Sequence, residues 1–170
     1  MIGVYGADLA NADNPEYRAA FEFAARYAGY HASPSVSPGA WVALRDGGPK
    51  LKGDYSFLMR RLPGPQLKSE QKVGPDDQRY GAWALTLAKG DQVAFAPDAD
   101  FVRSLKNAKV RVTYLDRGEG TFRMEVAGKT LHGTLANSGR WKTAEIEAIP
   151  GQIVIQTTTD LTLHMVEVAR

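Results

Sequence analysis

From residue 38 onward, short runs of alternating apolar and polar residues recur between clusters of Gly, Pro, Asn and Asp. Alternation places every second side chain on one face of a strand, and this spacing of turn residues is typical of antiparallel sheets. The pattern predicts strands over residues 40–45, 54–60, 80–87, 92–96, 109–115, 121–126, 129–136, 141–149, 152–156 and 161–168. So many strands require two packed sheets or a barrel. We predict a mainly β fold, a jelly-roll-like antiparallel β-sandwich.

The N-terminal region has a different pattern. Residues 13–16, Asp-Asn-Pro-Glu, resemble a helix start with a capping residue, a proline in the first turn and an acid near the positive end of the helix dipole. Residues 21–27 also alternate with period two, which would suit a strand, but their Ala, Glu and Arg content favours a helix that Gly29 can end. The sequence therefore predicts one short helix near residues 15–28.

The length of 170 residues suits one domain with a substantial core. We predict a single β-sandwich domain over residues 1–170, with an N-terminal helical extension at 1–38. Residues 62–78 form the longest polar, proline-rich stretch, which predicts a long surface loop. A domain linker is less suitable there, because each side alone has too few strands to close a sandwich.

Composition narrows the classes of function. The apolar runs are too short to span a membrane, and 21 basic residues against 19 acidic ones are scattered, which gives little support for nucleic-acid binding. The absence of cysteine excludes disulfides, thiolate metal sites and cysteine nucleophiles. Residues 1–10 lack the basic start and apolar core of a signal peptide, so we expect any export signal to lie outside this chain, as in a piece of a larger protein. Composition alone leaves the cellular location open.

Two of the three tryptophans lie in similar local sequences, GAWVAL at residues 39–44 and GAWALTL at 81–87. Trp83 shares a strand face with Leu85 and Leu87, which predicts a core position. Trp41 shares its face with Arg45, which fits either an exposed ring or a ring packed under the helix. Trp141 begins a strand whose same face is otherwise polar, where it can cap the edge of the sandwich or contact a ligand.

No catalytic motif has the required spacing. The three histidines are isolated, and we interpret them as structural. Asp98 and Asp100 in PDAD could supply oxygens to a structural Ca²⁺, although turns are ordinarily rich in aspartate, and we predict no other cofactor. Four carboxylates near glycines could furnish a pair for glycoside chemistry or simply be solvated turn residues: Asp46, Asp54, Asp116 and Glu119.

The second half of the chain carries a resemblance. The segments VRVTYLDRGEGTFRMEVAG (110–128), NSGRWKTAEIEAI (137–149) and DLTLHMVEVAR (160–170) are similar to the accessory β-sandwich domains that follow catalytic barrels in bacterial glycoside-hydrolase-like proteins. The resemblance covers roughly residues 80–170. Residues 38–47 and 51–64 also look like segments found between such barrels and sandwiches. Many of these sandwiches are carbohydrate-binding modules and others brace the catalytic domain, which implies an extracellular or periplasmic parent protein.

Sugar-binding residues vary among such domains, so the resemblance identifies none in this chain. We therefore select candidate residues by the chemistry of their side chains. Sugar rings stack on flat aromatic side chains, while their hydroxyls bond to polar groups. The best candidates are Trp41 with Arg45 and Tyr80 with Arg79, followed by Trp141. We therefore expect a non-catalytic carbohydrate-binding or accessory module that binds a polysaccharide or oligosaccharide beside a catalytic domain. A structural sandwich that docks on a neighbouring domain and a free-standing glycosidase or lyase remain alternatives.

Overall fold

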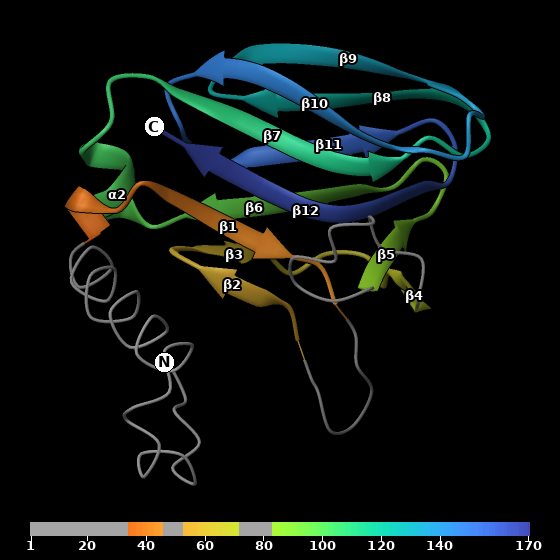
Figure 1. Cartoon of the computed structure of the whole chain (residues 1–170), viewed down its shortest axis with the longest axis horizontal. Coiled ribbons are helices and arrows are strands. Elements are labelled where there is room, and N and C mark those ends of the chain that lie inside the picture. The colour runs from red at the N-terminus through yellow and green to blue at the C-terminus, as the bar shows by residue number, and fades with distance from the viewer. Residues whose placement is uncertain (1–33, 46–52, 72–82) are drawn as a thin grey trace, which may run out of the picture.

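The computed structural model describes residues 34–45, 53–71 and 83–170. In this part of the chain, two antiparallel β-sheets pack face to face (Figure 1). The predicted β-sandwich is therefore confirmed. Most connections run from one sheet to the other, as in a jelly roll. The predicted helix near residues 15–28 lies outside the described residues, as do most residues of the predicted extension at 1–38.

Within the described residues, the larger sheet has seven strands. Five follow the spatial order β10-β7-β12-β1-β2, β5 pairs with β12, and β4 pairs with β5. Its strands are β1 (Gly39–Ala43), β2 (Tyr55–Phe57), β4 (Lys68–Gln71), β5 (Trp83–Leu87), β7 (Ala108–Leu115), β10 (Trp141–Ala148) and β12 (Leu161–Ala169). The dark blue strand β12 lies between β7 and the orange β1 in Figure 1. Residues 161–163 of β12 pair with β5, and residues 165–169 pair with β1.

The smaller sheet, in the same part of the chain, has five strands in the order β3-β6-β11-β8-β9. They are β3 (Met59–Arg61), β6 (Gln92–Pro97), β8 (Glu119–Val126), β9 (Lys129–Ala136) and β11 (Ile153–Thr157). Two short helices complete the described elements, the 3-10 helix η3 (Pro34–Val36) and α2 (Ala99–Arg103). None of the helices in the described ranges is long and apolar enough to cross a membrane.

The core lies between the sheets and follows the alternation of the sequence. In β7, Val110 and Val112 are fully buried, while the intervening Arg111 lies on the outer face. In β8, Phe122 and Met124 point inward, and the Phe122 ring meets that of Tyr114 edge-on at 4.8 Å between centroids. Burial of such alternating positions from both sheets is the main favourable term in a sandwich of this kind.

The predicted strand over residues 54–60 is in fact two strands in different sheets. Leu58 has a φ of 50°, in the left-handed region that β-strands do not use. The chain turns there, so that β2 joins the larger sheet and β3 joins the smaller one. A single run of alternating residues conceals this turn because Leu58 is itself apolar.

Two further elements were not expected from the sequence. Strand β4 lies within the predicted surface loop at 62–78 and pairs with β5, although its sequence, Lys-Ser-Glu-Gln, is polar. Helix α2 begins after Asp98, whose side chain accepts hydrogen bonds from the backbone N–H groups of Asp100 and Phe101. This is the geometry of an N-cap. Phe101 then buries its ring completely, which attaches the helix to the core.

A buried carboxylate fixes one end of the sandwich. Asp116 follows β7 and accepts bonds from the Ala136 N–H at 2.6 Å, the Ser138 hydroxyl at 2.5 Å and the Lys142 ammonium at 2.6 Å. Lys142 above all, and then Ser138, hold the pKa of Asp116 well below its ordinary value, because their bonds favour the charged form. Asp116 thereby links the ends of β7 and β9 to the start of β10.

Candidate functional site

The outer face of the larger sheet contains one continuous row of side chains across five strands. The register aligns Glu145 of β10 with Arg111 of β7, Arg111 with Glu167 of β12, Glu167 with Trp41 of β1, and Trp41 with Phe57 of β2. All five side chains share one face because the alternate residues of these strands point into the core. The row is charged at the β10 side and aromatic at the β2 side.

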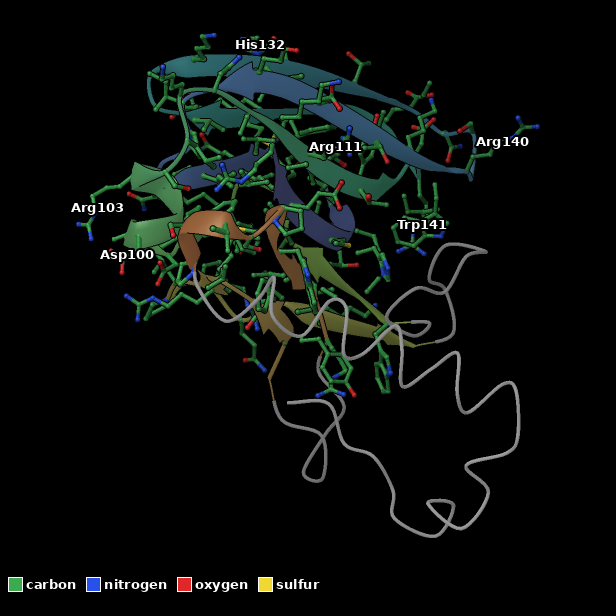
Figure 2. All side chains as sticks on the ribbon, turned by 60° about the vertical axis from the view of Figure 1, so that its left-hand side comes forward. Asp100, Arg103, Arg111, His132, Arg140 and Trp141 are labelled. Atoms are coloured by element: carbon green, nitrogen blue, oxygen red, sulfur yellow. The ribbon has the colours of Figure 1, made fainter. Side chains whose placement is uncertain are left out.

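The charged half is neutralised by its own ion pairs, because Arg111 and Lys109 together balance Glu145 and Glu167. The Arg111 Nε donates to Glu145 at 2.5 Å, and its Nη1 donates to Glu167 at 3.1 Å. The hydrogen bonds to Glu145 and Glu167 raise the pKa of Arg111, and the bond from Arg111 lowers the pKa of Glu145. Figure 2 shows Arg111 lying over the middle of this face. Arg111 already forms ion pairs with two carboxylates, so this half of the row is a poor site for a charged ligand.

The aromatic half consists of three rings and one guanidinium. The Trp41 and Phe57 rings lie 6.4 Å apart between centroids at an interplanar angle of 33°. One row further along β2, Tyr55 lies opposite the small Ala43 and is 46% exposed. The Arg45 guanidinium stacks on the Tyr55 ring at 3.6 Å from its centroid, which is a cation–π contact. We call Trp41, Tyr55, Phe57 and Arg45 the β1–β2 aromatic cluster.

Arg45 is held in place from several directions. Its backbone N–H donates to the Asp54 carboxylate at 3.0 Å, and its Nε donates to the Gly53 carbonyl at 3.3 Å. The residue is only 7% exposed, so its charge is largely removed from water. A guanidinium whose plane is fixed in this way is a rigid part of the cluster, in contrast to the mobile side chain of an exposed arginine.

The structure brings two of the five predicted binding residues, Trp41 and Arg45, to one region of the same face. Trp141 lies at another corner of the same sheet, at the start of β10, and its ring meets the His164 ring at 5.8 Å. Figure 2 shows Trp141 at the opposite end of the sandwich from helix α2. Arg79 and Tyr80 lie outside the described residues. A contribution from either of these two residues stays a prediction.

The predicted difference between the two related tryptophans is only partly right. Trp41 and Trp83 are both half-buried, so Trp83 does not belong to the fully buried core. Leu85 and Leu87, which share its strand face, are buried as predicted. Trp83 begins β5, and its backbone carbonyl bonds to the Nδ1 of His164 at 2.7 Å. The end of a strand leaves part of a large ring outside the core even when its face points inward.

Sequence reasoning missed Tyr55 and Phe57. The signal was present, because these residues occupy alternate positions next to the turn that follows the first tryptophan strand. Two aromatic residues on the same face of a neighbouring hairpin strand lie beside Trp41 if the two strands pair. Without knowledge of this pairing, the sequence indicates only Trp41, Trp141 and Tyr80 as candidate platform rings.

Four of the six carboxylates considered for calcium or glycoside chemistry have structural partners. Of the other two, Asp46 lies outside the described residues and Glu119 is exposed at the start of β8. Asp98 caps α2, and Asp100 forms an ion pair with Arg103 at the exposed end seen in Figure 2. Asp116 is buried among its own donors, and Asp54 bonds to Arg45 and Arg61. Within the described ranges, no group of three or more His, Asp or Glu residues has the arrangement of a metal site.

The outer face of the smaller sheet also has a hollow, of about 530 Å³, beside strands β8 and β9. Gln156, Arg123 and His132 lie side by side across β11, β8 and β9 and contribute to its lining. Phe122 is the only Phe, Tyr or Trp of this lining among the described residues, and its side chain is directed into the core. This hollow therefore lacks the exposed flat ring found at the β1–β2 aromatic cluster.

The sequence matches no model of a known protein family and no curated protein. Among solved structures, the chain is similar to the C-terminal CBM6 of LamC, a marine laminarinase from Zobellia galactanivorans, with 12% identity and a TM-score of 0.45 over 66% of this chain and 99% of that one. It is also similar to the CBM35 of Abf62 from Cellvibrio japonicus, with 18% identity and a TM-score of 0.39 over 65% and 93%.

A third similar structure contains the CBM22-1 and GH10 modules of the xylanase Xyn10B from Clostridium thermocellum in complex with xylohexaose. The identity is 14% and the TM-score 0.43, over 66% of this chain and 26% of the xylanase chain. Each of these three structures is a carbohydrate-binding module or contains one.

Proposed function

We propose that this chain is a non-catalytic carbohydrate-binding β-sandwich module of a larger polysaccharide-active enzyme. The observation that carries the proposal is the β1–β2 aromatic cluster, in which three rings and a stacked arginine lie together on the outer face of the larger sheet. The expected ligand is a polysaccharide or oligosaccharide chain that lies against this face.

The chemistry of the cluster suits a sugar. One face of a pyranose ring is formed by C–H groups, which pack on an aromatic ring with little conformational cost to the protein. The arginine and nearby backbone groups offer hydrogen bonds to the hydroxyls. Because paired strands hold Trp41 and Phe57, their spacing is set before the ligand arrives, which reduces the entropic cost of binding.

Binding on the rings alone should be weak and nearly insensitive to salt, because stacking and neutral hydrogen bonds involve no ion pairing. Affinity electrophoresis tests this in native gels that contain a neutral β-glucan, a xylan, a mannan or the acidic polygalacturonate. We expect at least one of these polysaccharides to retard the wild-type chain. Trp41→Ala should weaken that binding by about tenfold, through the loss of one stacking partner.

Trp141→Ala compares the two candidate tryptophans, since it removes a half-buried ring from the same sheet but at another corner. Melting temperatures of both variants separate loss of binding from loss of fold. Tyr80→Ala and Arg79→Ala in the same gels test the two predicted contacts outside the described residues. Loss of retardation in Trp141→Ala alone would move the site to the start of β10.

If no polysaccharide retards the wild type, the chain is better understood as a structural sandwich that docks on a neighbouring domain. A pull-down with the catalytic domain of its parent enzyme would then be the next measurement. Release of reducing sugar from any of these polysaccharides by the purified chain would instead contradict the non-catalytic assignment.

A further inference from the structure

A cleft of about 500 Å³ opens beside the β1–β2 aromatic cluster, between the edges of the two sheets. The larger sheet contributes Leu85 and the residue that follows β1, Arg45, while the smaller sheet contributes Val93 and Arg61. Residues 62–67 form one wall. This segment is attached to the smaller sheet by a hydrogen bond from the Leu62 N–H to the Ala94 carbonyl at 2.8 Å.

The floor of the cleft is apolar and its sides are cationic. Leu67, Leu85 and Val93 are all at least nine-tenths buried and line the cleft. Among the ionisable residues of the lining are two arginines and one aspartate, which leaves a net charge of +1 in a space partly removed from water. Electrostatic attraction is stronger in such a place than on an open surface.

The hydrogen bonds of the two arginines leave donors available. Arg61 uses its Nε to bind the second carboxylate oxygen of Asp54 at 2.8 Å, and Arg45 uses its Nε to bind the Gly53 carbonyl. In the part of the chain that the structure describes, neither arginine donates a hydrogen bond from its terminal Nη groups. Each guanidinium can therefore offer Nη donors to a bound group.

We propose that this cleft binds the carboxylate of a uronic acid residue, and that the glycan recognised by the chain is acidic. The inference rests on the proposed function and adds the chemical class of the ligand. A carboxylate is planar and matches the fork of guanidinium donors, as a hydroxyl does not. The apolar floor accepts the C–H face of the same sugar, and the volume lies within the range of small-ligand sites.

Arg45 joins the cleft to the aromatic cluster, because its guanidinium stacks on Tyr55 and the same residue is part of the cleft lining. A glycan chain can therefore place one charged residue in the cleft and stack its next residues on the rings. Both contacts use the same rigid arginine. Loss of that arginine would disturb both regions, so Arg61 is the better position for a test.

The test compares polygalacturonate, its methyl ester and dextran sulfate as ligands at low and high salt, by affinity electrophoresis and calorimetry. We expect the wild type to bind polygalacturonate at low salt, to lose affinity steeply as salt rises and to bind the methyl ester at least about tenfold more weakly. Arg61→Gln should weaken binding of polygalacturonate by about tenfold or more, while Arg61→Lys should retain part of it.

Arg103→Gln is the matched control, because it removes the same charge from an exposed arginine on α2, which does not line the cleft. Asp54→Asn provides a variant with the opposite expectation. It removes the carboxylate that competes for Arg61, so affinity for polygalacturonate should be retained or raised several-fold. A merely destabilised protein would not show a gain of affinity.

Equal binding by Arg61→Gln and Arg103→Gln would overturn the proposal, as would equal affinity for polygalacturonate and its methyl ester. Preferential binding of dextran sulfate would also contradict the choice of a carboxylate. If the wild type binds only neutral polysaccharides, the cleft inference fails and the proposed function stands. Salt-sensitive binding of polygalacturonate that Trp41→Ala leaves unchanged would support the cleft and contradict the aromatic cluster. If no glycan binds, both proposals fail.

Discussion

Substitution of Gly133 by alanine tests the packing of the smaller sheet against the core. A Cβ at this position would lie 2.2 Å from two atoms of the Phe122 ring, Cε1 and Cζ. Carbon atoms in contact normally lie about 3.5–4.0 Å apart, so the ring or the strand would have to move by more than about 1 Å. Phe122 is 2% exposed and is held by the edge contact with Tyr114, which leaves the ring little room to move.

Over-packing of this kind costs about 1–3 kcal/mol, and the severity of the contact places Gly133→Ala near the upper end. Urea denaturation measures this cost as a lower midpoint at unchanged slope. Gly151→Ala is the control, because its Cβ would meet the Ala127 Cβ at an ordinary 3.9 Å. It should change stability by less than about 0.5 kcal/mol, as expected of a substitution without a special packing role.

A double-mutant cycle makes the test specific to the ring. Phe122→Leu alone should destabilise the protein, but in the Gly133→Ala background it removes the atoms that collide with the new methyl group. The double variant should therefore lose less unfolding free energy than the two single losses added together, by about 1 kcal/mol or more. Equal urea midpoints for Gly133→Ala and Gly151→Ala, or strict additivity in the cycle, would refute the register of Phe122 opposite Gly133.

Three other predictions concern single residues. The folded-state pKa of Asp116 lies below its ordinary value of 3.8, so its stabilising effect is present above pH 3.8 and is lost as the pH falls. Lys142→Met removes the main cause of this low pKa and should move acid unfolding, monitored by circular dichroism, to higher pH. Trp41→Ala and Trp83→Ala should lower the melting temperature by similar amounts, since both rings are half-buried; a loss confined to Trp83→Ala would restore the predicted core role. Ala127 is exposed and has a φ of 48° in the turn between β8 and β9, so Ala127→Asn should stabilise by up to about 1 kcal/mol in urea denaturation.

The sequence predicts most of the described strands because one face of each is apolar. For β9 the bounds agree at both ends, and for β8 the prediction misses only the first two residues. The turn at Leu58 was not predictable, because an apolar residue with a left-handed backbone carries none of the Gly, Asn or Asp signals of a turn. The polar strand β4 was not predicted because it has no apolar pattern of its own. Only its pairing with β5 makes it a strand.

The candidate site was only half predictable for a related reason. A single strand indicates which residues share its face, and this placed Trp41 and Arg45 together. The partners from other strands depend on which strands pair and in what register, as in the alignment of Phe57 with Trp41. The cleft depends on how the two sheets pack, because Arg61 lines it from the smaller sheet. Neither the pairing of strands nor the packing of sheets follows from local alternation.

The place of β12 in the larger sheet has a consequence for how the protein is made. This strand comes after all the others in chain order, yet it pairs with β1, β5 and β7, whose residues begin at positions 39, 83 and 108. During synthesis, the facing edges of β1 and β7 stay open until residues 161–169 have left the ribosome. Open edges of apolar strands can pair with other chains. We therefore expect folding on the millisecond-to-second scale of sandwiches rich in distant contacts, and a better yield of soluble protein when synthesis is slowed.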